Sequence, residues 1–159
     1  MSRKSWSAFG VAAIVVIGVG VIHSGRSIAD SPVIQERRAL MKDMGKQMGI
    51  INDFLEKGVG DAAAVKAAAD TIHSNATKIP GLFPQGTSLA DNVGETGAKP
   101  EIWANFDNFK LAAAKLGELS AATSAVAGAG EKTAIGEAFK NMGENGCGGC
   151  HQTFRQKLN

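Results

Sequence analysis

One motif near the end of the chain has a spacing that points to a particular chemistry: Cys147-Gly148-Gly149-Cys150-His151. Two thiols separated by two residues on a helical turn can add to the two vinyl groups at one edge of a porphyrin. The imidazole beside the second thiol can then reach the iron. The motif therefore predicts one covalently bound haem c, with thioether bonds at Cys147 and Cys150 and with His151 as an axial ligand of the iron.

A Cys-x-x-Cys pair also has other uses. A structural disulfide or a thioredoxin-like redox pair would use the same spacing, but the redox motif belongs with strands. The sequence has no alternating strand pattern. A zinc site would need two further ligands, for which His23 and His73 are a poor supply. We therefore expect haem rather than a disulfide or zinc.

Four segments have apolar residues at alternating steps of four and three, which is the spacing of one helical face. The first predicted helix begins at Ser31-Pro32, a hydroxyl cap followed by a proline suited to a first turn, and ends at Gly58 and Gly60. Its stripe consists of Met41, Met44, Met48, Ile51 and Leu55, with Arg37 one step earlier.

The other three predicted helices follow in order. The second begins after the N-cap Asp61 and ends before Pro80; the third runs from Pro100-Glu101 to the glycines at 128 and 130. The fourth starts near Lys132, passes through the cysteine motif and ends near Phe154. The apolar stripe of the second helix is Val65, Ala69, Ile72 and Ala76. That of the third is Ile102, Phe106, Phe109, Ala113, Leu116 and Ser120, and that of the fourth is Ile135, Phe139 and Met142.

The links between these helices predict the fold. A rhythm of about 3.5 residues favours left-handed packing of nearly parallel helices. Helices one and two, and helices three and four, are joined by short links, so each pair should form an antiparallel hairpin. Between Lys78 and Lys99 lies a long stretch rich in Gly, Pro, Asn and Thr. We predict an all-α, antiparallel four-helix bundle with one long crossover loop between helices two and three.

The N-terminus has the pattern of an export signal. Arg3 and Lys4 precede a charge-free, mostly apolar stretch at 6–22, and Ser27-Ile28-Ala29 offers small residues for a signal peptidase. We predict a signal peptide over residues 1–29, a bundle domain over 30–159, and a periplasmic location. The alternative is an uncleaved inner-membrane anchor, although 17 residues is at the lower limit of a membrane span.

The charge balance excludes one class of partner. The chain has 17 basic and 15 acidic residues, and three of the basic residues but no acid lie in the first 29. The remainder therefore has a net charge of −1, without the basic stripe that nucleic-acid binding requires.

Several motifs together resemble one family. They are Arg37-x-x-x-Met41, Phe83-Pro84-Gln85-Gly86-Thr87, Ala98-Lys99-Pro100-Glu101-Ile102-Trp103 and Cys147-x-x-Cys150-His151-x-x-x-Arg155. In type and order they resemble the class II cytochromes c, the family of cytochrome c prime, and most of all its low-spin cytochrome c-556 branch. The resemblance spans nearly all of residues 30–159. It implies a four-helix bundle that is periplasmic in bacteria, with a histidine as the proximal iron ligand.

The resemblance also implies roles for three more residues. The family divides at the position four residues after the helix-one arginine, where the low-spin branch has a ligating methionine. Met41 has this position if Arg37 is the matching arginine; Arg38 would instead place Lys42 there. Met41 could also be an ordinary core methionine. The resemblance further implies a haem-propionate contact for Arg37 and a proximal-side contact for Arg155, although either arginine could simply be solvated.

These assignments predict a function. A thioether ligand closes the iron to exogenous ligands and favours its ferrous state, which suits a single-electron carrier between periplasmic redox proteins. The alternative is a five-coordinate cytochrome c prime that binds nitric oxide or carbon monoxide. We do not expect an enzyme, because a peroxidase would need a polar acid–base group on an open distal side, where Arg37 is the only candidate. A homodimer is compatible with the resemblance, and contact with a membrane is expected only if the N-terminal segment is retained.

Overall fold

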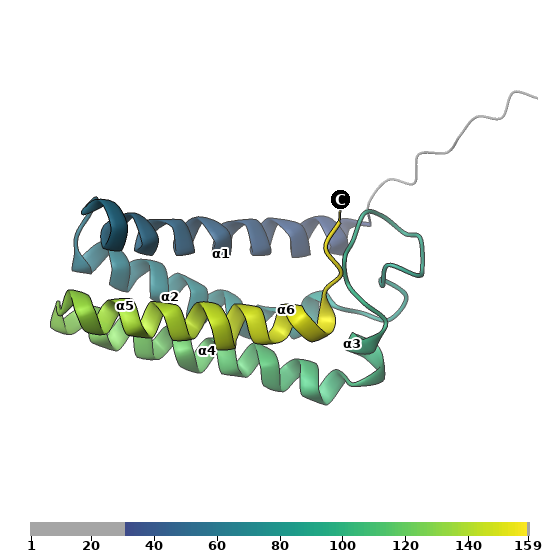
Figure 1. Cartoon of the computed structure of the whole chain (residues 1–159). Coiled ribbons are helices and arrows are strands. Elements are labelled where there is room, and N and C mark those ends of the chain that lie inside the picture. Colours follow the sequence, from purple (N-terminus) through teal and green to yellow (C-terminus); the bar gives the residue numbers. More distant parts are fainter. Residues whose placement is uncertain (1–30, 159) are drawn as a thin grey trace, which may run out of the picture.

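The computed structural model describes residues 31–158, and these form a bundle of four long rods lying side by side (Figure 1). The rods are α1 (Pro32–Lys57), α2 (Ala62–Lys78), α4 (Phe106–Ala129) and a composite of α5 (Lys132–Asn141), η2 (Met142–Gly148) and α6 (Gly149–Phe154). Two short helices, η1 (Pro80–Leu82) and α3 (Glu101–Ala104), lie in the connection between α2 and α4. The predicted four-helix bundle with one long crossover is confirmed.

The first two helices begin and end close to the predicted residues. Asp61 caps α2 with its carboxylate, which accepts a hydrogen bond from the Ala64 amide at 2.8 Å. Gly58 ends α1 in the left-handed region, with φ of 67°. The predicted hydroxyl cap at Ser31 is wrong, because its Oγ has no hydrogen-bond partner. Instead the backbone amide of Ser31 donates to the Val93 carbonyl at 3.1 Å and ties the start of α1 to the crossover.

The third predicted helix is interrupted. Asn105, with φ of −132° and ψ of 50°, separates α3 from α4, so a single continuous helix from Pro100 was the wrong prediction. The cause is tertiary: the indole N–H of Trp103 donates to the carbonyls of Phe83 and Pro84, both at 3.0 Å. These bonds hold α3 against the segment at 83–84. The helix axis therefore changes direction at Asn105, between α3 and α4.

The fourth rod is continuous but not uniform. Between α5 and α6, η2 is wound as a π-helix, with one more residue per hydrogen-bonded turn than an α-helix. Such wide turns occur mostly as short bulges, and frequently at functional sites. This one contains Cys147 and leads directly into Cys150 and His151.

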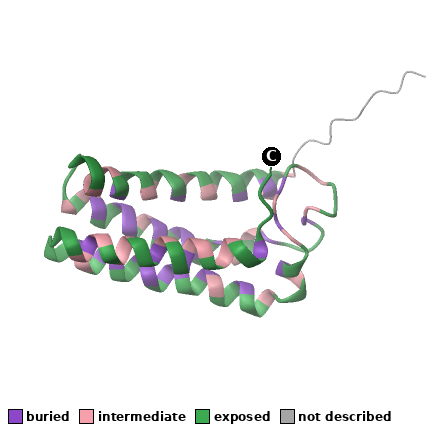
Figure 2. Ribbon diagram, viewed as in Figure 1, coloured by how far each residue is buried: buried purple, intermediate pink, exposed green. Residues whose placement is uncertain are grey.

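The core lies along the inward faces of the rods, as the distribution of buried residues shows (Figure 2). All four residues of the predicted α2 stripe are buried, and Ile51 and Ile135 have no exposed surface. α2 packs against both α1 and α4, whereas α1 makes only sparse direct contact with α5. The side of α1 facing the fourth rod is therefore available for something other than helix packing.

The crossover and the C-terminal tail hold each other. The Gln156 amide donates to the Gly97 carbonyl at 2.8 Å, and the Lys99 amide donates to the Phe154 carbonyl at 3.1 Å. The two segments approach so closely that a Cβ on Gly97 would overlap the carbonyl oxygen of Gln156. Only glycine fits at position 97 while this pairing is intact.

This pairing leads to a prediction for Gly97→Ala. The added methyl group must push the tail away from the crossover, so we expect a loss of roughly 1–3 kcal/mol in the free energy of unfolding, as for other overpacked sites. Urea titration followed by circular dichroism measures it. Gly128→Ala is the matched control: it lies in α4 with open space around its Cβ position and should gain about 0.5–1 kcal/mol. Equal stabilities of the two variants would contradict the prediction.

Candidate haem site

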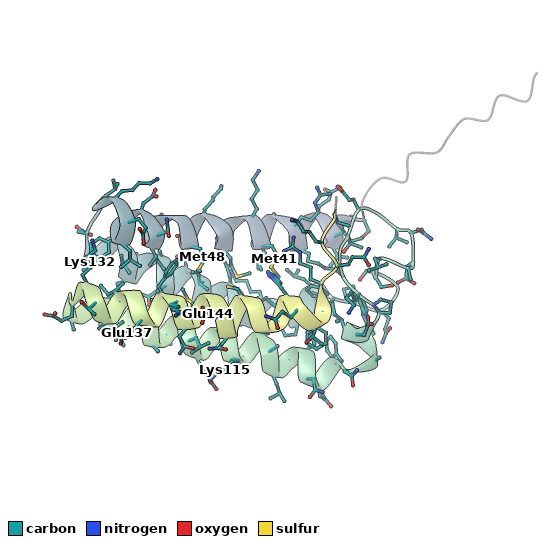
Figure 3. The ribbon with its side chains drawn as sticks, viewed as in Figure 1. Met41, Met48, Lys115, Lys132, Glu137 and Glu144 are labelled. Carbon is teal, nitrogen blue, oxygen red and sulfur yellow. The ribbon has the colours of Figure 1, made fainter. Side chains whose placement is uncertain are left out.

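A cavity of about 800 Å³ lies between α1 and the rod formed by η2 and α6, with α4 and the crossover closing its other sides. Cys147, Cys150 and His151 line it from the η2–α6 side. From α1 it is lined by three methionines, Met41, Met44 and Met48; Figure 3 shows Met41 and Met48 projecting from α1 toward η2 and α6. The structure therefore brings the predicted attachment motif and the predicted methionine ligand to one cavity.

The attachment motif has the chemistry that thioether formation and iron ligation need. Cys147 and Cys150 are free thiols, both half-buried. Burial raises the pKa of each, that of Cys150 to about 11, so the thiols stay protonated near neutral pH. Burial, and then the positive charge of Arg155, lowers the pKa of His151. The neutral imidazole that this favours has the lone pair that an iron ligand requires.

Glycines position η2 close to α4 at the motif. A Cβ on Gly146 would lie 3.0 Å from Cδ1 of Leu116 and 3.5 Å from its Cα, so the residue before Cys147 packs directly on the α4 backbone. Such a contact is tighter than side chains normally accept. The absence of a side chain at position 146 therefore sets how deep Cys147 lies in the bundle.

The three methionines of α1 are not equivalent. Met44 is 7% exposed and belongs to the core. Met48 packs on the fourth rod, with its methyl group 3.7 Å from the position a Cβ on Gly143 would take. Met41 is half-buried at the cavity wall. Met41 is thus less buried than Met44, and it is Met48 rather than Met41 that packs at Gly143.

Arg37 has a different set of partners from the one the sequence suggests. It is only 5% exposed, and its five N–H groups are all used. Nε and Nη2 both donate to the Leu82 carbonyl, at 3.1 and 2.9 Å. Nη2 also donates to Oγ1 of Thr87 at 2.8 Å. Nη1 donates to the Thr87 carbonyl and to Oγ1 of Thr96, both at 3.1 Å. Burial lowers its pKa to about 10, so it is still charged at neutral pH.

This arginine therefore clamps the crossover to α1. A contact with a haem propionate would require one of the five crossover bonds to be exchanged, so that predicted contact stays a prediction. The guanidinium also lies over the ring of Phe83, with its carbon 3.9 Å from the ring centroid. Cation and ring attract each other more strongly when both are removed from water.

Phe83 connects this clamp to the cavity floor. Its ring lies edge-on to Phe109 with centroids 4.7 Å apart, and Phe109 packs edge-on against Phe154 at 5.4 Å. All three rings line the cavity. The aromatic row therefore runs from the crossover through α4 to the end of α6, three residues after His151.

Arg155 lies where the tail leaves α6. Its backbone pairs with Ala98 of the crossover, and its exposed side chain lines the cavity and also a shallow hollow beside His151. The positive charge of Arg155, after burial, contributes to the lowered pKa of His151. The proximal-side contact of Arg155 with a haem stays a prediction.

These residues fit a covalently bound haem. The cavity has the volume typical of ligand pockets and a largely apolar lining, with thiols and an imidazole on one wall and thioethers on the other. When bound, a haem supplies one-electron chemistry at its iron. Within residues 31–158 no three His, Cys, Asp or Glu side chains gather as metal ligands would. His73 is exposed on α2, with Nδ1 2.8 Å from the Gly117 carbonyl.

Comparison with known proteins places this geometry in a family. The family profile described as Cytochrome C' matches residues 32–155. The cytochrome c-556 of Agrobacterium fabrum is 42% identical over 128 residues, covering 78% of this chain and 81% of that protein. The cytochrome c' of Rhodopseudomonas palustris is 31% identical over 147 residues, covering 89% and 94%. The solved cytochrome c' of Thermochromatium tepidum superposes with a TM-score of 0.69 at 32% identity, covering 79% of this chain and 95% of that one.

A four-helix bundle with a Cys-x-x-Cys-His motif on its last helix and a cavity beside it defines a class II c-type cytochrome. The chain belongs to the cytochrome c' family, and covalently bound haem c is its cofactor. The resemblance inferred from the sequence motifs is confirmed.

Three features of the site were missed by reasoning from sequence. The crossover clamp had one usable signal, since Arg37 falls on the buried stripe of the first helix. The π-helical η2 had only its cluster of glycines. The pairing of Gly97 with Gln156 joins segments that are 59 residues apart, and no local sequence pattern predicts it.

The clamp predicts the behaviour of Arg37→Lys. A lysine keeps the charge but has three donors on one atom instead of five in a planar fork, so buried carbonyls of the crossover lose partners. We expect a loss of roughly 2–4 kcal/mol in the free energy of unfolding and faster proteolysis between residues 79 and 99.

Arg38→Lys is the matched control. Arg38 is exposed and pairs with Glu95 at 3.1 Å, a surface interaction worth at most about 1 kcal/mol. Equal losses in the two variants, measured by urea titration and by thermolysin digestion, would show that the buried fork of Arg37 has no special role.

Proposed function

We propose that this protein is a periplasmic carrier of single electrons whose haem iron is ligated by His151 and Met41. The observation that carries the proposal is the position of Met41, half-buried on the wall of α1 in the same cavity as His151. The burial of Met44 and the contact of Met48 with Gly143 leave Met41 as the best-placed thioether.

The chemistry of this ligand pair suits electron transfer. A thioether is a soft donor that favours ferrous iron and raises the reduction potential. With both axial positions filled by protein, little rearranges when the electron arrives. The greater identity to the cytochrome c-556 of A. fabrum, 42% against 31% for the cytochrome c' of R. palustris, supports this branch of the family.

A second function has one observation in its favour. The matched solved structures include cytochromes c', such as that of T. tepidum at 32% identity. If Met41 packs on the porphyrin without ligating the iron, the site would be five-coordinate and open to nitric oxide or carbon monoxide. We rank this below electron transfer because Met41 faces the cavity, and in neither case do we propose an enzyme.

Location and partners are part of the proposal. Residues 1–29, the predicted signal peptide, lie outside the described residues, and we propose that they direct the domain at 30–159 to the periplasm. Within residues 31–158 no helix has the length and apolar character needed to cross a membrane. A solved cytochrome c' that is 33% identical is described as having an unusual ligand-controlled dimer dissociation. We propose a homodimer here as well, which light scattering of the holoprotein would test.

Met41→Ala tests the ligand assignment. Loss of the thioether should convert a low-spin ferrous spectrum with sharp bands into a broad, high-spin one that shifts on addition of carbon monoxide. It should also abolish the ferric charge-transfer band that sulfur ligation produces in the red. Visible spectra of the oxidised and reduced holoprotein, with and without carbon monoxide, measure all three changes.

Met48→Ala is the matched control, because it removes a thioether from the same cavity and the same helix face. Its spectrum should stay low-spin and insensitive to carbon monoxide. A wild-type protein that already binds carbon monoxide would favour the gas-binding function. An unchanged Met41→Ala spectrum would remove Met41 from the iron.

A further inference from the structure

Three cations form a row on α1. Arg38, Lys42 and Lys46 are spaced four residues apart and are all exposed, so they lie one above another on a single face of the helix. Like charges at this spacing repel each other and destabilise a helix. The repulsion within the row is therefore unfavourable for α1. We call Arg38, Lys42 and Lys46 the basic row.

Most of its charge is not neutralised by the protein. Arg38 pairs with Glu95 of the crossover at 3.1 Å. Within the described part of the chain, no carboxylate lies within ion-pair distance of Lys42 or Lys46. Asp43, the acid between them in sequence, instead accepts hydrogen bonds from the side-chain amides of Gln47 and Asn75. Two cations are thus left facing solvent.

The basic row lies at the rim of the haem cavity. Arg38 and Lys42 line the cavity themselves, and Lys46 is one turn beyond Lys42. On the tail, Arg155 and Leu158 line the same cavity, Leu158 with 43% of its surface exposed. Glu95, which also lines the cavity, pairs with Arg38. The rim therefore combines the charge of Lys42, which has no ion-pair partner among residues 31–158, with an exposed apolar side chain. Weak electron-transfer encounters use small interfaces of this kind.

We propose that the basic row is the docking site for the acidic face of a redox partner protein. This inference rests on the proposed function in electron transfer. The domain at 30–159 has a net charge of −1, so its overall charge would not attract an acidic partner. A local cluster of cations beside the cavity would attract and orient one, because complementary charge raises the encounter rate and brings the partner to the haem.

Two other uses of the row have less support. Anionic lipid would also attract cations, but membrane-binding helices put several large apolar residues beside the basic face. Here Gly45 and Gly49 are exposed beside the row, and Ile50, 42% exposed and one turn beyond Lys46, is the single exposed large apolar residue of α1. The propionates of the protein's own haem could neutralise Lys42. Neutralisation by the propionates would leave Lys46 unexplained, since Lys46 does not line the cavity.

The test is voltammetry of the holoprotein on gold electrodes coated with carboxylate-terminated monolayers, which stand in for an acidic protein face. The variant is Lys42→Gln/Lys46→Gln. The control is Lys132→Gln/Lys140→Gln, which removes the same charge from exposed positions of α5 outside the cavity lining. We expect the wild type and the control to exchange electrons with the electrode at low ionic strength, and both to slow as salt is added. The row variant should be about tenfold slower at low salt and nearly insensitive to salt.

Three outcomes overturn the proposal. Equal slowing in both variants would mean that only net charge matters. A changed absorption spectrum or midpoint potential in the row variant, with wild-type salt dependence, would assign the lysines to the haem propionates. Loss of binding to phosphatidylserine vesicles, without a change at the electrode, would assign them to lipid. A high-spin, carbon monoxide-binding wild type that still shows the row-dependent electrode rates would refute Met41 ligation and leave the docking site standing.

Discussion

The burial of one positive charge, that of Arg37, is the constraint on which the rest of the site depends. A guanidinium removed from water is costly unless its donors are satisfied, and here all five N–H groups have protein acceptors. The acceptors at positions 82, 87 and 96 all belong to the crossover. A long, polar segment with little regular structure thereby obtains one defined conformation, which its own composition does not specify.

The crossover in turn joins the two walls of the cavity. It is held to α1 by Arg37 and Ser31, and to the end of α6 by the pairing of Gly97 with Gln156. Direct packing between α1 and α5 is sparse. At this end of the bundle the two walls are therefore joined by hydrogen bonds through the crossover, in addition to the packing of α1 on α2, of α2 on α4 and of α4 on η2.

The predictability of each feature follows from the range of the interactions that produce it. The rods at 32–57 and 62–78, and the continuous fourth rod, follow from local apolar spacing and from caps such as Asp61. The break at Asn105 depends on bonds from Trp103 to carbonyls about 20 residues away, and η2 depends on close packing against Leu116. The attachment motif was predictable because haem chemistry fixes its spacing. The hydrogen-bond partners of Arg37 were not predictable, because they lie 45 to 59 residues away in the sequence.

The clamp and the methionine are linked by helix geometry. Arg37 and Met41 are four residues apart, so their side chains leave α1 from nearly the same face, one turn from each other. Inserting Arg37 into the crossover fixes the rotation of α1 about its axis, and this rotation directs Met41 into the cavity. The same rotation turns Arg38 and Lys42, each one residue further round the helix, toward the rim. One buried arginine thus determines both what faces the cavity interior and which charges surround its entrance.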